Sequence, residues 1–274
     1  MKTALILTTA LGFALPASAQ DAGADWDLTT QDGLTVAHAQ FDNGLLLGAR
    51  CQAGTFQVLI AGLPEAPEAR NLLSARRILK IGFRDDPVSD QGFMIGDNRR
   101  VAFAELPAPL ARDMREGGQM QIVVTGGAEN GRNLRYVLDL PPSNSAIDQA
   151  LGACDRPLVD PRDSELAALA DDGLPPKIGW RRRPAPDYPQ GPTYTAGFAV
   201  TTCLARPDGR LSDCIIETEF PANGGFGAAV LESVRSARLM NRDGGPVPLT
   251  RIVYRTNFLM DDGSPSTGSR LRSD

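Results

Sequence analysis

The chain has 274 residues and a formal net charge of −5, and it is rich in glycine, with 28 residues, and in proline, with 21. This acidic balance excludes the usual basic type of nucleic-acid-binding protein. Beyond the N-terminus no apolar stretch is long enough for a membrane anchor. The apolar residues come in short alternating runs, which predict more strands and turns than helices. We therefore expect an α+β protein that binds no nucleic acid and has no membrane anchor.

Residues 1–19, MKTALILTTALGFALPASA, form the first recognisable segment. Lys2 precedes an apolar run, and Pro16 separates that run from the small residues 17–19. This pattern is typical of a secretory signal peptide that is cleaved before Gln20. We expect the mature protein to be exported to an oxidising compartment.

Residues 20–158 predict a β-rich N-terminal domain. Runs such as RILKIGFR and QMQIVVTG alternate apolar and polar residues, as half-buried strands of a sandwich or barrel-like sheet do. Residues 107–118 instead place apolar residues at four-residue spacing and end in a Gly-Gly pair. Residues 143–154 carry a Ser/Asn cap and place Cys154 on an apolar face. The domain should therefore contain two short helices.

The chain has four cysteines, an even number. In an oxidising compartment this predicts two disulfides, for which three pairings exist on paper. The turn signal Asp208-Gly209 centres a hairpin in which Cys203 lies opposite Cys214, and this pairing leaves Cys51 with Cys154. A bulged loop would shift the hairpin by one residue. Two free buried thiols are the alternative to a disulfide.

Residues 159–183 form the predicted linker, in a part of the chain that is acidic and rich in proline and has one short helical stretch at 164–170. The arginine run 181–183 is interpreted as a solvated edge of the linker. Because few apolar residues are available to join the flanking regions, we expect the two domains to unfold separately.

Residues 184–260 predict a β-β-α-β C-terminal domain. A hairpin over 196–220 precedes a helix over 226–237, and the final strand runs over 249–259. Residues 261–274 are expected to be a disordered tail.

The C-terminal domain resembles that of TonB-type energy transducers. The resemblance rests on PDYP at 186–189, Asp208-Gly209 in the hairpin, SVRSARL in the helix, and GPVP at 245–248. It implies a periplasmic protein whose last strand is an accessible sheet edge that pairs with a segment of an outer-membrane receptor. The partner-binding residues on that strand are then Arg251, Val253, Arg255 and Asn257.

Two features depart from the TonB pattern. A family transducer carries an inner-membrane anchor and a long proline-rich stretch, whereas this chain has a cleavable signal and a globular first domain. We therefore do not expect it to relay force from an inner-membrane motor. The first domain more distantly resembles invasion-associated envelope proteins of alphaproteobacteria through Trp26, Asn43-Gly44, the segment AELPAPLARDMREGGQMQIVV and the closing SAIDQALGAC.

Catalysis is not expected. His38 is the one histidine of the chain and lies on a predicted strand, with no nucleophile motif to accompany it. The carboxylates of Asp85, Asp86, Asp90 and Asp97 are interpreted as a solvated loop. Neither a metal site nor a cofactor is predicted.

We predict a soluble periplasmic envelope protein that acts by protein–protein recognition. The expected partner is an envelope protein such as a TonB-dependent receptor. One alternative is a dimeric structural or assembly factor of the envelope, in which the C-terminal domain forms a homodimer. A hydrolase with a carboxylate site in the N-terminal domain is the other.

Overall fold

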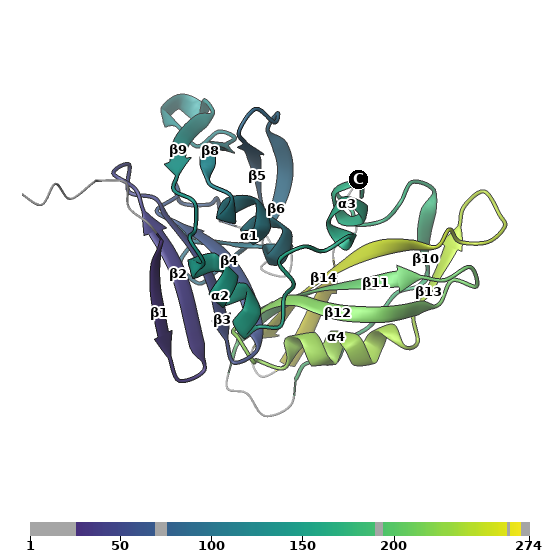
Figure 1. The fold of residues 1–274 in the computed structure, drawn as a ribbon. Helices are drawn as coiled ribbons and strands as arrows, with labels where there is room; N and C mark the ends of the chain where they lie inside the picture. The colour runs from purple at the N-terminus through teal and green to yellow at the C-terminus, as the bar shows by residue number, and fades with distance from the viewer. Residues whose placement is uncertain (1–25, 69–75, 190–193, 262–263, 270–274) are drawn as a thin grey trace, which may run out of the picture.

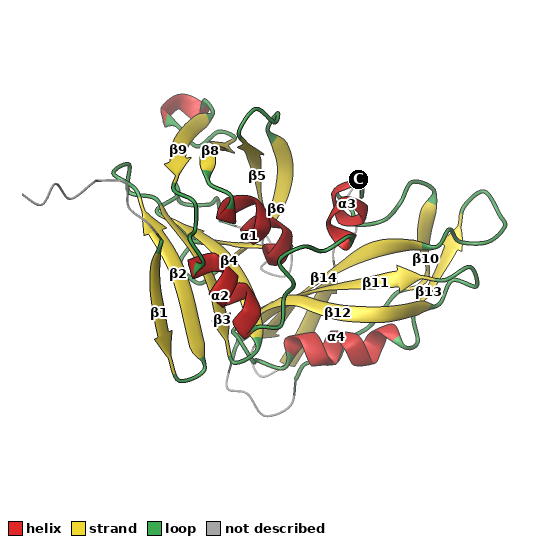
Figure 2. Ribbon diagram, viewed as in Figure 1, coloured by secondary structure: helices red, strands yellow, loops and turns green. Residues whose placement is uncertain are grey.

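The computed structural model describes residues 26–68, 76–189, 194–261 and 264–269, with side chains as far as residue 260. The predicted signal peptide at 1–19 and its cleavage site lie outside the described residues. Strands outweigh helices, as the alternating runs predicted, and the mixed content is that of an α+β protein (Figure 2).

The N-terminal region forms one nine-stranded antiparallel sheet with the strand order β1-β2-β3-β4-β7-β6-β5-β8-β9 (Figure 1). Its strands are β1 (Asp27–Gln31), β2 (Leu34–Gln40), β3 (Leu46–Gln52), β4 (Thr55–Ala61), β5 (Arg76–Phe83), β6 (Ser89–Ile95), β7 (Ala102–Ala104), β8 (Gly118–Val124) and β9 (Leu134–Leu140). The helical elements are α1 (Pro107–Arg115), the 3₁₀ turn η2 (Glu129–Gly131) and α2 (Ala146–Ala153). The predicted pair of short α-helices is thus present.

The core of this region lies between the inner face of the sheet and the helices α1 and α2. On β8, for example, Met120, Ile122 and Val124 alternate inward and are buried. Helix α1 packs against β4, and α2 packs against β2 and β3. Leu110 and Met114 of α1 share the buried face that their four-residue spacing predicted.

The C-terminal region forms a four-stranded sheet with the order β12-β11-β14-β15, and one face of it carries α4 (Figure 2). Its elements are β11 (Ala196–Ala205), β12 (Leu211–Phe220), α4 (Phe226–Val234), β13 (Arg238–Asn241), β14 (Thr250–Asp261) and β15 (Ser264–Ser269). Phe226, Val230 and Val234 of α4 are buried against the sheet. The order β-β-α-β of the prediction is therefore present, with two further short strands.

The predicted linker is folded. It contains α3 (Arg162–Ala167) and β10 (Ile178–Arg182), and β10 pairs with β13 in a small second sheet. Leu174 and Ile178 are buried in the C-terminal core, and Leu166 of α3 packs with Val200 and Val253. These scattered apolar residues anchor a segment whose overall composition predicted a loose connection.

The predicted disordered tail also differs in part from the structure. β14 continues to Asp261, and β15 pairs with it from Thr256↔Ser269 to Asp261↔Ser264. Polar composition led to the prediction of a tail, whereas main-chain pairing with a neighbouring strand requires no apolar side chains.

Both predicted disulfides are present. Cys51 and Cys154 are bonded across 103 residues and tie β3 to the end of α2, while Cys203 and Cys214 are bonded across the hairpin of β11 and β12. Disulfides of this kind are typical of proteins from oxidising compartments. Among the described residues, no helix combines the length and the apolar character that crossing a bilayer requires.

Candidate functional site

The predicted partner-binding edge on β14 is closed. β14 lies inside the sheet, between β11 and β15, over residues 256–259. Further back along the strand, the N–H of Val253 donates to the carbonyl oxygen of Gly173 at 2.8 Å. Gly173 adopts a φ of +75°, and a side chain there would collide with the carbonyl oxygen of Val253, so glycine permits this close approach. The main-chain donor of Val253 is therefore already used within the chain.

The side chains proposed for partner binding are engaged within the chain. Arg251 Nε lies 3.1 Å from Glu165 Oε2, and Arg255 forms an ion pair with Glu105. Val253 is buried, and Asn257 is half-buried and pairs in register with Phe198. The prediction of a partner-binding site at these four residues treated the C-terminal domain alone, whereas in the structure Arg251 contacts the folded linker and Arg255 contacts the N-terminal domain. Partner binding at these residues stays a prediction.

A buried carboxylate joins the two domains at this face. Glu105, which follows β7 and is 1% exposed, accepts from Arg76 Nε of β5 at 2.5 Å and pairs with Arg255 of β14. Arg76 also reaches Asp171 of the linker at 2.9 Å. Burial alone would lower the pKa of Arg76, but the carboxylates of Glu105 and Asp171 raise it overall. The guanidinium is therefore held in its charged form inside the junction.

A second buried carboxylate, Glu217 of β12, is placed by a β-bulge. Val200 pairs with Thr218 but Thr201 pairs with Ile216, so Glu217 is the extra residue. Its side chain accepts from Thr202 Oγ1 at 2.5 Å and lies 3.2 Å from Arg162 Nη1 and 3.8 Å from Arg156 Nη1. The bulge thus places the carboxylate opposite two arginines of the preceding segments.

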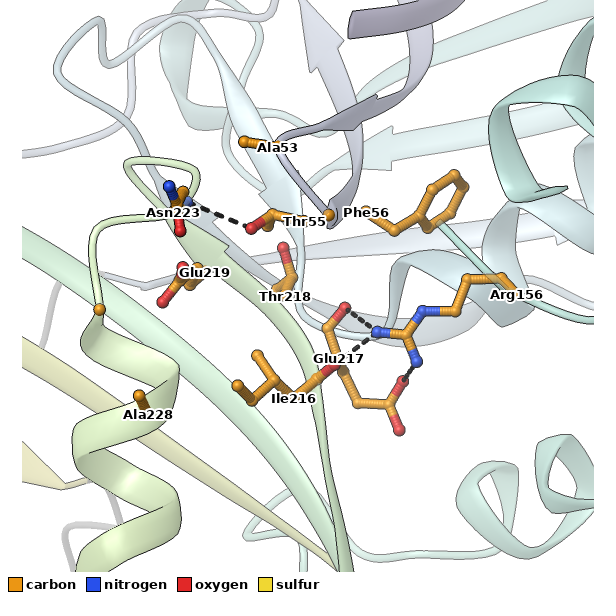
Figure 3. Close-up of a pocket in the computed structure, with 12 residues that line it drawn as sticks. Ala53, Thr55, Phe56, Arg156, Ile216, Glu217, Thr218, Glu219, Asn223 and Ala228 are labelled. Atoms are coloured by element: carbon orange, nitrogen blue, oxygen red, sulfur yellow. Dashed lines mark hydrogen bonds and ion pairs between the residues drawn. The ribbon is translucent and has the colours of Figure 1, made fainter. Parts of the chain in front are cut away.

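Arg156 completes this arrangement from the loop that follows α2. Its Nη2 donates to the carbonyl oxygens of Ile216 and Glu217 (Figure 3). Burial lowers the pKa of Arg156, although the carboxylate of Glu217 acts in the opposite direction. The edge of β12 is occupied here, because its carbonyl groups already have a donor.

A cavity of about 260 Å³ lies directly beside Arg156, between the two domains (Figure 3). We call it the junction pocket. It is lined by Ala53, Gly54, Thr55, Phe56, Arg156, Ile216, Glu217, Thr218, Glu219, Asn223, Gly225 and Ala228. Ligand-binding sites are often found at domain interfaces, and this cavity draws on both domains.

The turn between β3 and β4 forms one wall of the junction pocket. Ala53 and Gly54 have φ values of 47° and 80°, the left-handed pair typical of a two-residue hairpin turn. This turn carries Thr55, whose Oγ1 accepts from the N–H of Asn223 at 3.2 Å. Next to it, Gln57 Nε2 donates to the carbonyl oxygen of Glu219 at 2.5 Å. These two contacts fix the N-terminal wall against the C-terminal one.

The charged side chains of the junction pocket have partners within the protein. Glu217 pairs with Arg156 and Arg162, and Glu219 Oε2 accepts from the N–H of Gly227 at the start of α4, at 2.7 Å. The hydroxyl of Thr218 is different: the residue is 1% exposed, and within the part of the chain that the structure describes its Oγ1 has no hydrogen-bond partner. Figure 3 shows this oxygen pointing toward Thr55. The unused hydrogen-bonding capacity is therefore neutral, which suits an uncharged polar group.

No residue of this pocket was predicted as a functional residue from the sequence. The available signal is the presence of two glutamates, Glu217 and Glu219, in a predicted strand. The structure buries residues 217–219, and a buried carboxylate requires a partner. The arginine partners of Glu217 come from 55 and 61 positions away, and the bulge that directs Glu217 toward them has no sequence pattern of its own.

The remaining titratable candidates lie apart from the junction. His38 Nε2 is 3.7 Å from Asp27 Oδ2 on the outer face of β1 and β2, and its side chain is 35% exposed. Asp85, Asp86, Asp90 and Asp97 are all exposed, and Asp90 pairs with Lys80 at 2.7 Å. In the described part of the chain, no three His, Cys, Asp or Glu side chains are grouped as a metal site would require.

Comparison with protein-family models, with curated proteins and with solved structures finds no match to this chain.

Proposed function

We propose that this is a periplasmic envelope protein that acts by recognising another protein, and that a segment of the partner occupies the junction pocket. The observation that carries the proposal is the chemistry of that pocket. Its charged side chains have partners within the chain, whereas the buried hydroxyl of Thr218 has none among the described residues. A peptide amide, or an amide or hydroxyl side chain, would supply both a donor and an acceptor there.

The position of the pocket supports the same proposal. On β14 the N–H of Val253 already donates to Gly173, and on β12 main-chain carbonyl groups already accept hydrogen bonds from Arg156 and Gln57. Recognition by strand addition along those stretches is thereby disfavoured, whereas a cavity between two domains still admits a short segment. The periplasmic location is supported by the signal-like sequence at 1–19 and by two disulfides.

Site-specific photocrosslinking from Asn223 in the bacterial envelope tests the proposal. Asn223 is exposed and lines the pocket, so a crosslinker there should capture an envelope protein. Ala228→Phe places a ring in the same cavity from an exposed helix position and should reduce that adduct roughly tenfold, the effect of about 1.4 kcal/mol of lost binding.

The matched control is Glu232→Phe, which adds the same ring one turn along α4 at an exposed position away from the pocket lining. It should leave the adduct unchanged. An adduct that Ala228→Phe does not diminish would overturn the proposal. An adduct made only of two copies of this chain would favour the dimeric assembly factor instead.

A further inference from the structure

A second depression lies on the outer face of the nine-stranded sheet and shares no lining residue with the junction pocket. It spans β2, β3 and β4 and has a volume of about 260 Å³. In register, Gly48 of β3 lies between His38 of β2 and Leu59 of β4, and Arg50 lies between Val36 and Gln57. The depression is centred on Gly48, because the neighbouring positions on this face all carry side chains. We call it the Gly48 pit.

The fold does not require glycine at position 48. Its φ is outside the left-handed range, and a Cβ would lie 3.4 Å from Leu59 Cγ and 3.8 Å from Leu46 Cδ2, which are ordinary contact distances. Glycine inside a strand weakens the strand, because it loses more conformational entropy on folding than other residues and has no side chain to pack. A mid-strand glycine often marks a bulge, a bend or a place where a ligand or another backbone approaches closely. At Gly48 the pairing of β3 with both neighbouring strands is regular, so a bulge does not account for the glycine.

The walls of the pit are partly apolar and partly cationic. Leu34, Val36, Leu46 and Leu59 are half-buried around it. Arg50 stands at one side, where its Nε donates to Gln57 Oε1 at 2.7 Å and its guanidinium lies 5.8 Å from the ring centre of Phe103. Within the described residues, no carboxylate lies within ion-pair distance of Arg50. Burial lowers the pKa of this arginine, and no neighbouring acid offsets the effect.

We infer that the Gly48 pit binds the C-terminal residue of a peptide, with an apolar side chain over Gly48 and the terminal carboxylate on Arg50. An arginine without an acidic partner beside an apolar depression is complementary to a carboxylate that carries a compact apolar group. The polar side chains of His38 and Gln52 also line the pit and interrupt its apolar surface. The apolar part is therefore suited to one side chain rather than to a long acyl chain.

The pit is also continuous with the domain interface. Gln57, which holds Arg50, donates its Nε2 to the carbonyl oxygen of Glu219 in the other domain. Phe103, beneath the guanidinium, packs against Phe220 with ring centres 4.8 Å apart. The inference does not rest on the junction pocket, because the two cavities share no lining residue.

Calorimetric titration of the full mature protein with the dipeptide acetyl-Ala-Leu tests this inference. The free acid should bind, and the C-terminal amide of the same dipeptide should bind at least tenfold more weakly, because it lacks the charge that faces Arg50. Octanoate should bind more weakly than the free-acid dipeptide. Tighter binding of octanoate than of the dipeptide would contradict the peptide proposal and indicate an acyl-chain ligand instead. Equal binding of the dipeptide and its amide would overturn the role of Arg50.

Variants separate the two halves of the site. Gly48→Val should abolish binding while the melting temperature stays the same or rises, and Gly48→Ala serves as the milder filling variant. Arg50→Met should weaken binding roughly tenfold, since it removes the charge and keeps the apolar stem. The matched controls are Thr29→Val and Arg135→Met, both exposed and outside the lining, which should bind normally. Unchanged binding in a folded Gly48→Val protein would end the proposal.

Discussion

At the scale of single residues, the junction depends on two buried carboxylates that the sequence gives little reason to connect with their arginines. Glu105 and Glu217 are each 1% exposed, and each is bonded to groups from distant parts of the chain. Buried ion pairs of this kind contribute little net stability when complete, because desolvation offsets the attraction. Their loss is costly, because one partner then remains buried and uncompensated.

Replacement of Glu217 by Ala should therefore be strongly destabilising, by about 3 kcal/mol. It removes the acceptor of Thr202 and leaves Arg156 with main-chain carbonyls alone, while Arg162 retains Asp160. Urea unfolding at neutral pH measures the change. Glu65→Ala is the control, because that residue is 58% exposed in its pair with Arg99 and should cost less than about 1 kcal/mol. Equal losses in both variants would contradict the role given to Glu217.

At the scale of elements, the disulfide of the hairpin was predicted correctly from a strand register that differs from the observed one. Counting outward from Asp208-Gly209 places Cys203 opposite Cys214. In the structure, the loop Pro207–Gly209 sets Ala205 opposite Leu211, one residue away from that count. A bulge at Asp213, whose φ is 49°, then restores the pairing before the cysteines are reached. The predicted disulfide is confirmed, although two register shifts cancel to produce it.

The sequence predicts what local patterns determine, and it does not predict contacts between segments that are far apart in the chain. Alternating runs, caps and turns are local signals, and they predicted the strand-rich first domain, the helix at 226–237 and both disulfides. Closure of β14 by Gly173, by contrast, depends on where a separate segment lies after folding. The periodicity of apolar residues in β14 carries no information about a contact with a distant segment. The accessible edge was therefore assigned to β14, which Gly173 of the linker contacts.

Removing the hairpin disulfide should loosen the C-terminal domain. Cys203→Ala with Cys214→Ala frees a loop of 11 residues, for which the chain-entropy model gives a loss of about 3 kcal/mol. Register near Asp213 should also become less well defined, because the disulfide fixes the strands beside the bulge. Hydrogen exchange should then show faster opening of β11 and β12, with β2 and β3 unaffected. Protection that stays unchanged in β12 would contradict this account.

At the scale of the whole molecule, the structure argues against the separate unfolding that the acidic linker predicted. Phe103 of the first domain packs with Phe198 and Phe220 of the second, with ring centres 4.8 Å apart for Phe103 and Phe220. The ion pairs of Glu105 and Glu217 cross the same boundary. Leu166 and Leu174 tie the linker to the C-terminal domain. Domains that share buried apolar and charged contacts unfold together when those contacts are worth more than the stability difference between them.

We therefore expect one calorimetric transition at pH 7, and acid should weaken the coupling that produces it.

Burial would raise the pKa of Asp160, but hydrogen bonds from Arg162 and the charge of Arg112 hold it below its usual value. A carboxyl group whose pKa is lower in the folded state stabilises that state above about pH 3.9, its usual unfolded value, and this contribution disappears as the pH falls through the folded pKa. Near pH 3 the transition should broaden or divide, because Asp160 pairs with Arg112 of α1 and with Arg162 of α3, and Arg162 in turn pairs with Glu217 of the other domain. Asp160→Asn should be less stable at pH 7 and should lose this part of the pH dependence. Two well-separated transitions of the unaltered protein at pH 7 would show instead that the junction does not couple the domains.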